Sequence, residues 1–80
     1  MIKLYRVIDN PDYFDRFTLC FASNEGPFVY GASENPYHPQ GFGQYGGDMY
    51  FGPDQTLGEE IPRDELPEPV QRLVASIEGE

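Results

Sequence analysis

His38 is the only histidine of the chain, and histidine is the side chain best suited to acid–base chemistry near neutral pH. As a general base it would be oriented by Glu34 or Asp48, and Ser33 would be the nearest nucleophile in the sequence. No Gly-x-Ser-x-Gly motif surrounds Ser33, so the pair lacks a recognisable nucleophile turn. We therefore predict no catalytic residue and interpret His38 as a loop residue that hydrogen-bonds a carbonyl. A small hydrolase-like enzyme that uses His38 stays open as an alternative.

The turn after the first apolar segment has the side chains best suited to bind a metal ion. It contains Asp9, Asn10, Asp12 and Asp15. A calcium loop of the EF-hand type needs Gly at its sixth position and Glu at its twelfth. Counted from Asp9, those positions hold Phe14 and Cys20, and one His with one Cys cannot complete a tetrahedral zinc site. Turn and capping roles explain the cluster better, and we predict neither a metal nor another cofactor.

The glycines in residues 31–53 suggest a phosphate-binding loop, but the charges of this segment oppose it. A Walker-type loop needs a Lys followed by Ser or Thr, and residues 31–53 contain no Lys or Arg. The whole chain carries a net charge of −9, which repels a phosphate backbone. We therefore expect no direct binding of nucleic acid.

The same segment, Gly31–Pro53, combines breaker residues with aromatic rings. It contains six of the nine glycines, three of the eight prolines and five of the twelve aromatic residues. We predict a long ordered loop held by its own rings, and such loops are usually functional. Rigid amphipathic rings are favoured at protein interfaces. The candidate contacts with a protein partner in this loop are Tyr37, His38, Phe42, Tyr45 and Tyr50. A second interpretation, that Tyr37 and Phe42 fold inward to complete the core beneath the loop, stays equally open.

The negative charge is concentrated in the second half of the chain. Residues 1–47 contain five acids and three bases, whereas residues 48–80 contain nine acids and two bases. This distribution fits either a solvated surface or an acidic face that docks on a basic protein surface, in competition with nucleic acid. The acidic candidate residues for such docking are Asp54, Glu59, Glu60, Asp64, Glu65 and Glu68.

The apolar periodicities predict the elements that must position these residues. Ile2–Ile8 is rich in β-branched and aromatic residues, and Arg16–Ala22 alternates between apolar and polar side chains. A four-residue turn joins the second strand to Pro27–Gly31, so these two strands form an antiparallel hairpin. Asp48–Phe51 is a candidate final strand.

A helix is predicted over Pro67–Glu78, because its apolar residues fall on one helical stripe. The stripe consists of Leu66, Val70, Leu73, Val74 and Ile77. The fold class is therefore α+β: a small antiparallel sheet of three to four strands, with one C-terminal helix packed on one face and a long ordered glycine and aromatic loop. The 80 residues make a single domain.

The cellular setting follows from further absences in the sequence. Cys20 is the only cysteine, so no intramolecular disulfide forms, and it fits a small buried hydrophobic residue. The first residues have no apolar core typical of a secretory signal, and no apolar run approaches the ~18 residues of a membrane span. We expect a cytoplasmic protein without a membrane partner.

The stretch Gly31-x-Ser33-x-Asn35-Pro36-Tyr37-His38-Pro39-Gln40-Gly41-Phe42-Gly43-Gln44 resembles a signature of small uncharacterised proteins of phages, prophages and other mobile elements. The resemblance extends to Asp15-Arg16-Phe17-Thr18, to Gly58-x-x-Ile61 and to Leu66-Pro67-x-x-Val70-Gln71. It implies an accessory protein of a mobile element, found in the host cytoplasm, where proteins that modulate or inhibit host factors, including anti-defence proteins, are common. It implies no catalytic residue. A self-assembling structural accessory protein is the remaining alternative.

Overall fold

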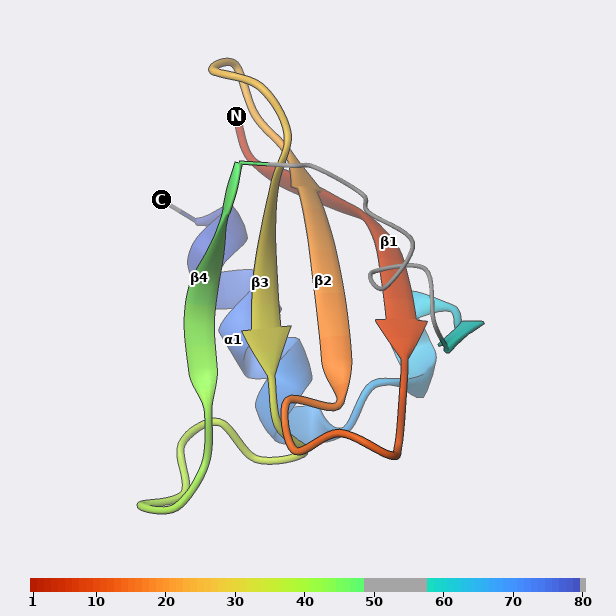
Figure 1. Ribbon diagram of the computed structural model, residues 1–80. Helices are drawn as coiled ribbons and strands as arrows, with labels where there is room; N and C mark the ends of the chain where they lie inside the picture. The colour runs from red at the N-terminus through yellow and green to blue at the C-terminus, as the bar shows by residue number, and fades with distance from the viewer. Residues whose placement is uncertain (49–57, 80) are drawn as a thin grey trace.

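The structure is a computed structural model of the chain, and it describes residues 1–48 and 58–79. Five strands form one antiparallel sheet in the order β4-β3-β2-β1-β5, and helix α1 lies across one face of this sheet (Figure 1). The elements are β1 Lys3–Asp9, β2 Phe17–Ala22, β3 Phe28–Ala32, β4 Gly43–Asp48, β5 Glu59–Glu60, the short 3-10 helix η2 Arg63–Glu65, and α1 Glu68–Glu78. The α+β class and the C-terminal helix are confirmed, but the sheet has five strands rather than three or four.

Strands β2 and β3 form the predicted hairpin. Leu19 pairs with Tyr30 and Phe21 with Phe28 in an antiparallel register. The connecting turn closes through Gly26 N–H, which donates to Ser23 O at 3.1 Å. Gly26 has a φ of +112°, a conformation that glycine adopts without a steric penalty. The turn at residues 23–26 and the alternating pattern of the strands beside it therefore favour the same structure, a hairpin.

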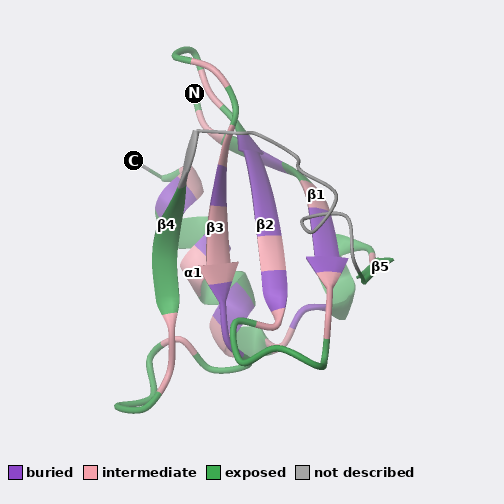
Figure 2. Cartoon of the chain, in the orientation of Figure 1, coloured by how far each residue is buried: buried purple, intermediate pink, exposed green. Residues whose placement is uncertain are grey.

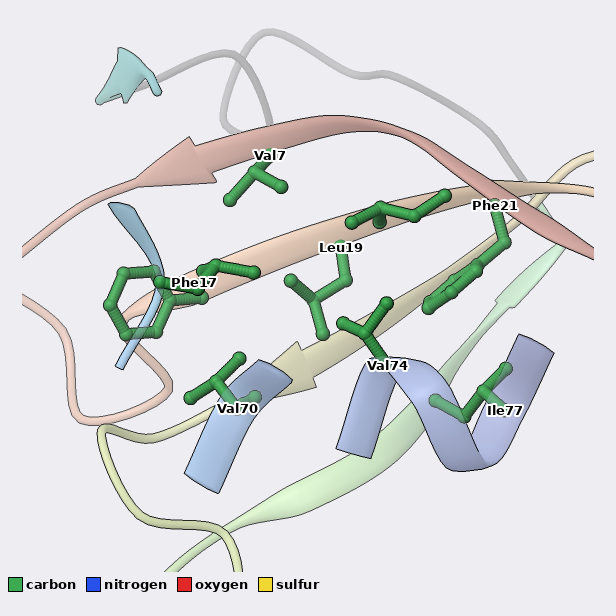
Figure 3. Close-up of a cluster of buried hydrophobic side chains, with 10 residues drawn as sticks. Val7, Phe17, Leu19, Phe21, Val70, Val74 and Ile77 are labelled. Atoms are coloured by element: carbon green, nitrogen blue, oxygen red, sulfur yellow. The ribbon is translucent and has the colours of Figure 1, made fainter. Parts of the chain in front are cut away.

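The core fills the space between the sheet and α1. Alternation along β2 directs Phe17, Leu19 and Phe21 to the helix, and all three are buried. Val70 and Val74 of α1 meet them from the other side, as Figure 3 shows. Together these side chains form one hydrophobic cluster, as expected when an apolar helix stripe and an apolar sheet face cover each other.

Leu73 lies at the flank of this core rather than in its centre. It is half-buried, whereas Val74 is fully buried. The Leu73 Cδ2 atom lies 3.3 Å from where a Cβ on Gly43 would be, so Leu73 packs toward the start of β4. The helical stripe is therefore centred on Val70, Val74 and Ile77, with Leu73 closing its edge against the β3–β4 loop.

Helix α1 ends at Glu78, as predicted, and begins at Glu68, one residue after the predicted start. Pro67 is its N-cap residue, and the Pro67 carbonyl accepts hydrogen bonds from Val70 N–H and Gln71 N–H at 3.0 Å. A proline is tolerated there because the first helical amides have no intrahelical partner. At the other end, Gly79 N–H donates to Ala75 O at 3.0 Å and closes the last turn.

Strand β4 corrects the prediction of one continuous loop over Gly31–Pro53. Gly43–Asp48 pairs with β3, with Ala32 opposite Gly43 and Tyr30 opposite Tyr45. Glycines are tolerated here because β4 is the terminal strand of the sheet. Of the predicted strand Asp48–Phe51, the structure describes only Asp48, which lies in β4. Residues 49–51 lie outside the described residues.

The sheet face opposite α1 buries a second, smaller group of side chains: Ile8, Cys20 and Val29. Cys20 is fully buried, as predicted, and pairs in register with Val29. Burial raises the pKa of the Cys20 thiol to about 11. The thiol is therefore uncharged at neutral pH and contributes to packing. Figure 2 shows that the buried residues gather on the central strands, while β4 and the loops are more exposed.

Within residues 1–48 and 58–79, no helix has the length and apolar character needed to span a membrane.

Candidate functional site

Two loops meet at the end of the sheet where α1 begins (Figure 1). The first, residues 10–16, joins β1 to β2, and the second, residues 33–42, joins β3 to β4. Between them lies a cavity of about 400 Å³. We call it the end-loop cavity, and it is lined by Pro11, Tyr13, Phe14, Arg16, Ser33, Glu34, Asn35, His38, Gln40 and Gly41. It brings residues that are more than twenty positions apart in the chain into one site.

The first loop is folded by hydrogen bonds that leave two aromatic rings at its surface. Asn10 N–H donates to Arg16 O at 2.8 Å, and Tyr13 N–H donates to Asn10 O at 3.2 Å. The Asn10 side chain accepts from Asp12 N–H at 3.3 Å, which is the turn role predicted for this cluster. Tyr13 is 54% exposed and its neighbour Phe14 is 66% exposed. The loop therefore presents two adjacent rings to solvent on a hydrogen-bonded turn.

The second loop is closed at its base by Ser33 and Phe42. Ser33 N–H donates to Phe42 O at 2.8 Å, and Phe42 N–H donates to the Ser33 hydroxyl oxygen at 2.9 Å. Ser33 is buried, so its side chain fastens the loop instead of facing solvent. One residue before Phe42, a Cβ on Gly41 would lie 2.0 Å from Asn35 O, so only glycine fits there. The loop thus has a defined shape that depends on Ser33 and Gly41.

His38 also has a structural role in this loop. Its Nδ1 atom accepts a hydrogen bond from Gln40 N–H at 3.1 Å, and its carbonyl accepts from Gly41 N–H at 2.7 Å. The imidazole is exposed and lines the end-loop cavity. The prediction that the imidazole hydrogen-bonds a loop carbonyl is therefore wrong in its partner, because the imidazole accepts from the Gln40 amide N–H within the loop.

Arg16 ties the two loops together. Its Nε and Nη2 atoms donate to the two carboxylate oxygens of Asp9 at 2.6 and 2.9 Å, and its Nη1 atom donates to Glu34 at 2.5 Å. These hydrogen bonds, the one with Asp9 first, raise the pKa of Arg16 above its usual value. The guanidinium carbon also lies 5.2 Å from the centre of the Phe17 ring. The only cation of the cavity is therefore already neutralised by two carboxylates.

The structure brings two of the aromatic-loop candidates to this end of the molecule. His38 lines the cavity, and exposed Tyr37 lies beside α1, where the Arg72 guanidinium carbon is 5.7 Å from its ring centre. Phe42 is half-buried, with its Cε1 atom 3.4 Å from where a Cβ on Gly31 would be. Phe42 thus follows the inward interpretation, and Tyr37 follows the outward one.

Tyr45 belongs to a different part of the surface. It lies on β4, with its ring centre 5.9 Å from those of Phe28 and Tyr30. It lines a separate cavity of about 410 Å³ at the other end of the sheet, together with Ile2 and Ile77. Tyr50, the remaining aromatic candidate, lies outside the described residues.

The acidic candidates that the structure describes lie in β5, η2 and α1, and none of them lines the end-loop cavity. Glu59 and Glu60 form β5, Asp64 and Glu65 lie in η2, and Glu68 is the first residue of α1. Glu60 is paired with Arg6, whose Nε atom lies 2.6 Å from the Glu60 carboxylate. Asp54 lies outside the described residues. The described acidic residues are therefore not part of the end-loop cavity.

Tyr13, Phe14 and Arg16 are site residues that the sequence analysis did not select. The signal was two consecutive aromatic residues, Tyr13-Phe14, directly after the Asn10-Pro11 turn and outside both strand patterns. Large aromatic side chains in a polar turn stay exposed at the surface, so they indicate a site of contact with another molecule.

The described residues include no group of three or more His, Cys, Asp or Glu side chains positioned to hold a metal ion. In the turn that has metal-ligand chemistry, Asp9 is bound by Arg16, and Asn10 caps the backbone.

No protein-family model, curated protein or solved structure matches this chain. A functional proposal therefore depends on the geometry and charge of the chain itself.

Proposed function

We propose that this protein is a small acidic protein-binding module that engages its partner through the end-loop cavity. The observation that carries this proposal is the exposure of Tyr13 and Phe14 at the rim of a cavity of about 400 Å³. Aromatic residues at the surface are typical of interfaces, where a few buried rings contribute most of the binding free energy.

The loops around the cavity support this role because their shape is set before any partner arrives. The Arg16 hydrogen bonds to Asp9 and Glu34 link the two loops, and Ser33 closes the second one. A surface that is already ordered loses less conformational entropy on binding, so more of the contact energy appears as affinity. The rings of Tyr13 and Phe14 are rigid themselves and lose few rotamers.

The charge indicates the kind of partner. A net charge of −9, with acids along β5, η2 and the start of α1, favours a protein with a basic surface and accelerates its association. The resemblance to mobile-element proteins suggests a cytoplasmic host factor, whose basic nucleic-acid-binding surface this chain would compete for. We propose no enzymatic step, because Ser33 and His38 both have structural hydrogen bonds in the loop.

A site-specific crosslinking experiment tests the proposal. A photo-crosslinking phenylalanine analogue replaces Phe14 in one bait and Tyr5 in a matched control bait. Tyr5 is 51% exposed and lies on β1, outside the end-loop cavity. We expect a crosslinked partner from position 14 and none from position 5. The proposal fails if both baits crosslink the same proteins equally, or if neither yields a specific partner.

A purified partner then allows a quantitative check. Tyr13→Ser/Phe14→Ser should weaken binding at least about tenfold, since the loss of interface rings is costly. Tyr5→Ser should leave the affinity within about twofold, since a ring outside the interface contributes no binding contact. Both variants change exposed side chains only, so thermal unfolding should show little loss of stability. His38→Ala tests the enzyme alternative: His38 is one of ten residues that line the cavity, so a binding module loses only part of its affinity, whereas an enzyme that uses His38 as its general base loses its activity.

Self-association through the sheet edge is a second candidate with one supporting observation. β4 is a terminal strand with exposed Gly43, Gln44 and Gly46, and it contains no Pro or Lys to discourage pairing. The opposite edge is β5, which has two residues, both Glu. Light scattering from about 10 µM to about 1 mM tests this candidate, because mass action drives weak self-association in that range. A monomeric mass throughout excludes it, and Gln44→Lys should abolish any dimer seen.

A further inference from the structure

We infer that the end-loop cavity takes an arginine side chain from an extended segment of the partner, with the guanidinium against the rings of Tyr13 and Phe14. This inference rests on the proposed function and adds the chemistry of the bound group. Three features of the cavity lead to it: its charge, its aromatic rim and its size.

The charge of the two loops favours a cation. Residues 9–16 and 33–42 contain four acids, Asp9, Asp12, Asp15 and Glu34, and one base, Arg16, which leaves a net charge of −3 with His38 neutral. Arg16 is held by Asp9 and Glu34, so it presents little positive charge to an incoming group. Asp12 and Asp15 do not line the cavity, but they are exposed next to Tyr13 and Phe14 in the chain, on the same loop. A cationic side chain entering here gains attraction from these carboxylates.

The aromatic rim favours arginine over lysine. A planar guanidinium stacks on a ring and donates to carboxylates at the same time, whereas an ammonium group is a compact, strongly hydrated charge. The molecule already uses this arrangement once at this end, at Arg16, and it places a second guanidinium, that of Arg72, near a ring. The Arg16 guanidinium lies 5.2 Å from the Phe17 ring centre while it binds two carboxylates, and the Arg72 guanidinium lies 5.7 Å from the Tyr37 ring centre. Tyr13, Phe14 and the nearby acids offer an incoming arginine the same combination.

The size of the cavity favours a single extended segment. At about 400 Å³ it is near the lower end of the range of ~300–1,000 Å³ typical of ligand sites. One or two long side chains fill such a volume, whereas a whole helix does not enter it. The walls come from two loops on opposite sides, so the segment lies across them with its side chain inserted between.

Peptide titrations followed by amide chemical shifts test this inference on the full-length protein. The probes are three blocked hexapeptides that differ only at two central positions, which hold arginine, lysine or citrulline. Citrulline has nearly the shape of arginine without its charge. We expect the arginine peptide to shift the amides of Tyr13, Phe14, His38 and Gln40. It should bind at least about threefold tighter than the lysine peptide, as expected for added ring stacking, and about tenfold tighter than the citrulline peptide.

Matched charge variants separate a local site from the general negative field. Asp12→Asn/Asp15→Asn removes two charges from the loop that carries the rings, and Asp64→Asn/Glu65→Gln removes two charges from η2, which contributes no residue to the cavity. In about 150 mM salt, where screening acts over about 8 Å, the first pair should weaken arginine-peptide binding at least fivefold and the second less than twofold. Equal effects of the two pairs overturn the inference, because the attraction would then be nonspecific.

Other outcomes also have a definite meaning. The inference is overturned if the arginine peptide causes no shifts, or if citrulline binds as well as arginine. It is also overturned if the shifts centre on η2 and α1 instead of the two loops. A partner that crosslinks at position 14 while the arginine peptide fails leaves the binding-module proposal standing and refutes only the arginine assignment. A missing crosslink refutes the binding-module proposal itself.

Discussion

Two neighbouring residues of α1 allow a direct test of how the core is built. The apolar stripe alone predicts that Leu73→Ala costs about 2–5 kcal/mol, the usual range for a buried leucine. In the structure, Val74 is fully buried and Leu73 is half-buried at the flank. We therefore predict that Val74→Ala destabilises the protein more than Leu73→Ala, although leucine is the larger side chain.

The expected magnitudes follow from the burial of each side chain. Val74→Ala removes two buried carbons, worth about 1.6 kcal/mol, and a residual cavity of about 40 Å³ adds about 1 kcal/mol. The higher helix propensity of alanine offsets about 0.5 kcal/mol of this destabilisation, so the net cost of Val74→Ala is about 2 kcal/mol. Leu73→Ala removes three carbons that are only half-buried, so its net cost is about 1 kcal/mol.

Urea unfolding followed by far-UV circular dichroism measures both costs. The comparison is valid when the variants share one m-value, because a changed slope would report a changed unfolded or native state. Ser76→Ala, on the exposed face of the same helix, is the control and should stay within about 0.5 kcal/mol of the wild type. If Leu73→Ala costs more than Val74→Ala, the placement of the helix over the sheet is wrong.

Three further predictions concern other parts of the fold. Hydrogen bonds from Arg63 and, to a smaller extent, from Leu4 N–H lower the pKa of Glu78. The stability that this carboxylate contributes is therefore present above its unfolded pKa of about 4.3 and is lost as the pH falls through the lower folded pKa. Glu78→Gln should lower the melting temperature at pH 7 but have little effect at about pH 2, and an equal loss at both pH values would contradict this assignment. Cys20 is buried and its pKa is raised to about 11, so a thiol reagent at about pH 8 should react fully only in denaturing urea; rapid labelling of the native protein would refute its burial. A Cβ on Gly58 would lie 2.6 Å from Asp9 O, whereas one on Gly26 would meet nothing within 4 Å, and both glycines have a positive φ. Gly58→Ala should therefore cost more than Gly26→Ala by about 1 kcal/mol or more in urea unfolding, since backbone strain alone costs about 1–3 kcal/mol; equal costs would mean that the clash is relieved by movement.

The elements with a local signal were predicted from the sequence. The alternation along Arg16–Ala22 and the turn at residues 23–26 specify a hairpin, since period two and turn chemistry depend on neighbouring residues only. The helix was predicted for the same reason, because its prolines, its stripe and Gly79 all agree. In these segments the local propensity and the burial pattern favour the same structure. Tertiary packing therefore stabilises the structure that the local sequence already favours.

Strand β4 was decided by tertiary structure. Gly43–Asp48 contains three glycines and no alternation of apolar and polar residues, so its own sequence does not predict a strand. It becomes one because β3 offers an edge to pair with, and because Gly43 fits against Pro36 and Leu73, where a Cβ would lie 2.9 Å from the Pro36 Cβ. The propensity of an edge strand depends on what it packs against, and that context comes from distant residues.

The candidate site was predicted only in part for the same reason. The sequence alone showed that Tyr37 and His38 belong to an unusual aromatic loop, and that the chain is strongly acidic. It did not show that residues 10–16 would contact that loop. This contact depends on the order of the strands. It also depends on Arg16, which donates hydrogen bonds to both Asp9 and Glu34, two residues that are 25 positions apart in the chain. Composition and local pattern therefore determined the charge, the hairpin and the helix of this protein. Only the folded sheet decided which loops stand side by side, because strand pairing joins residues that no local pattern connects.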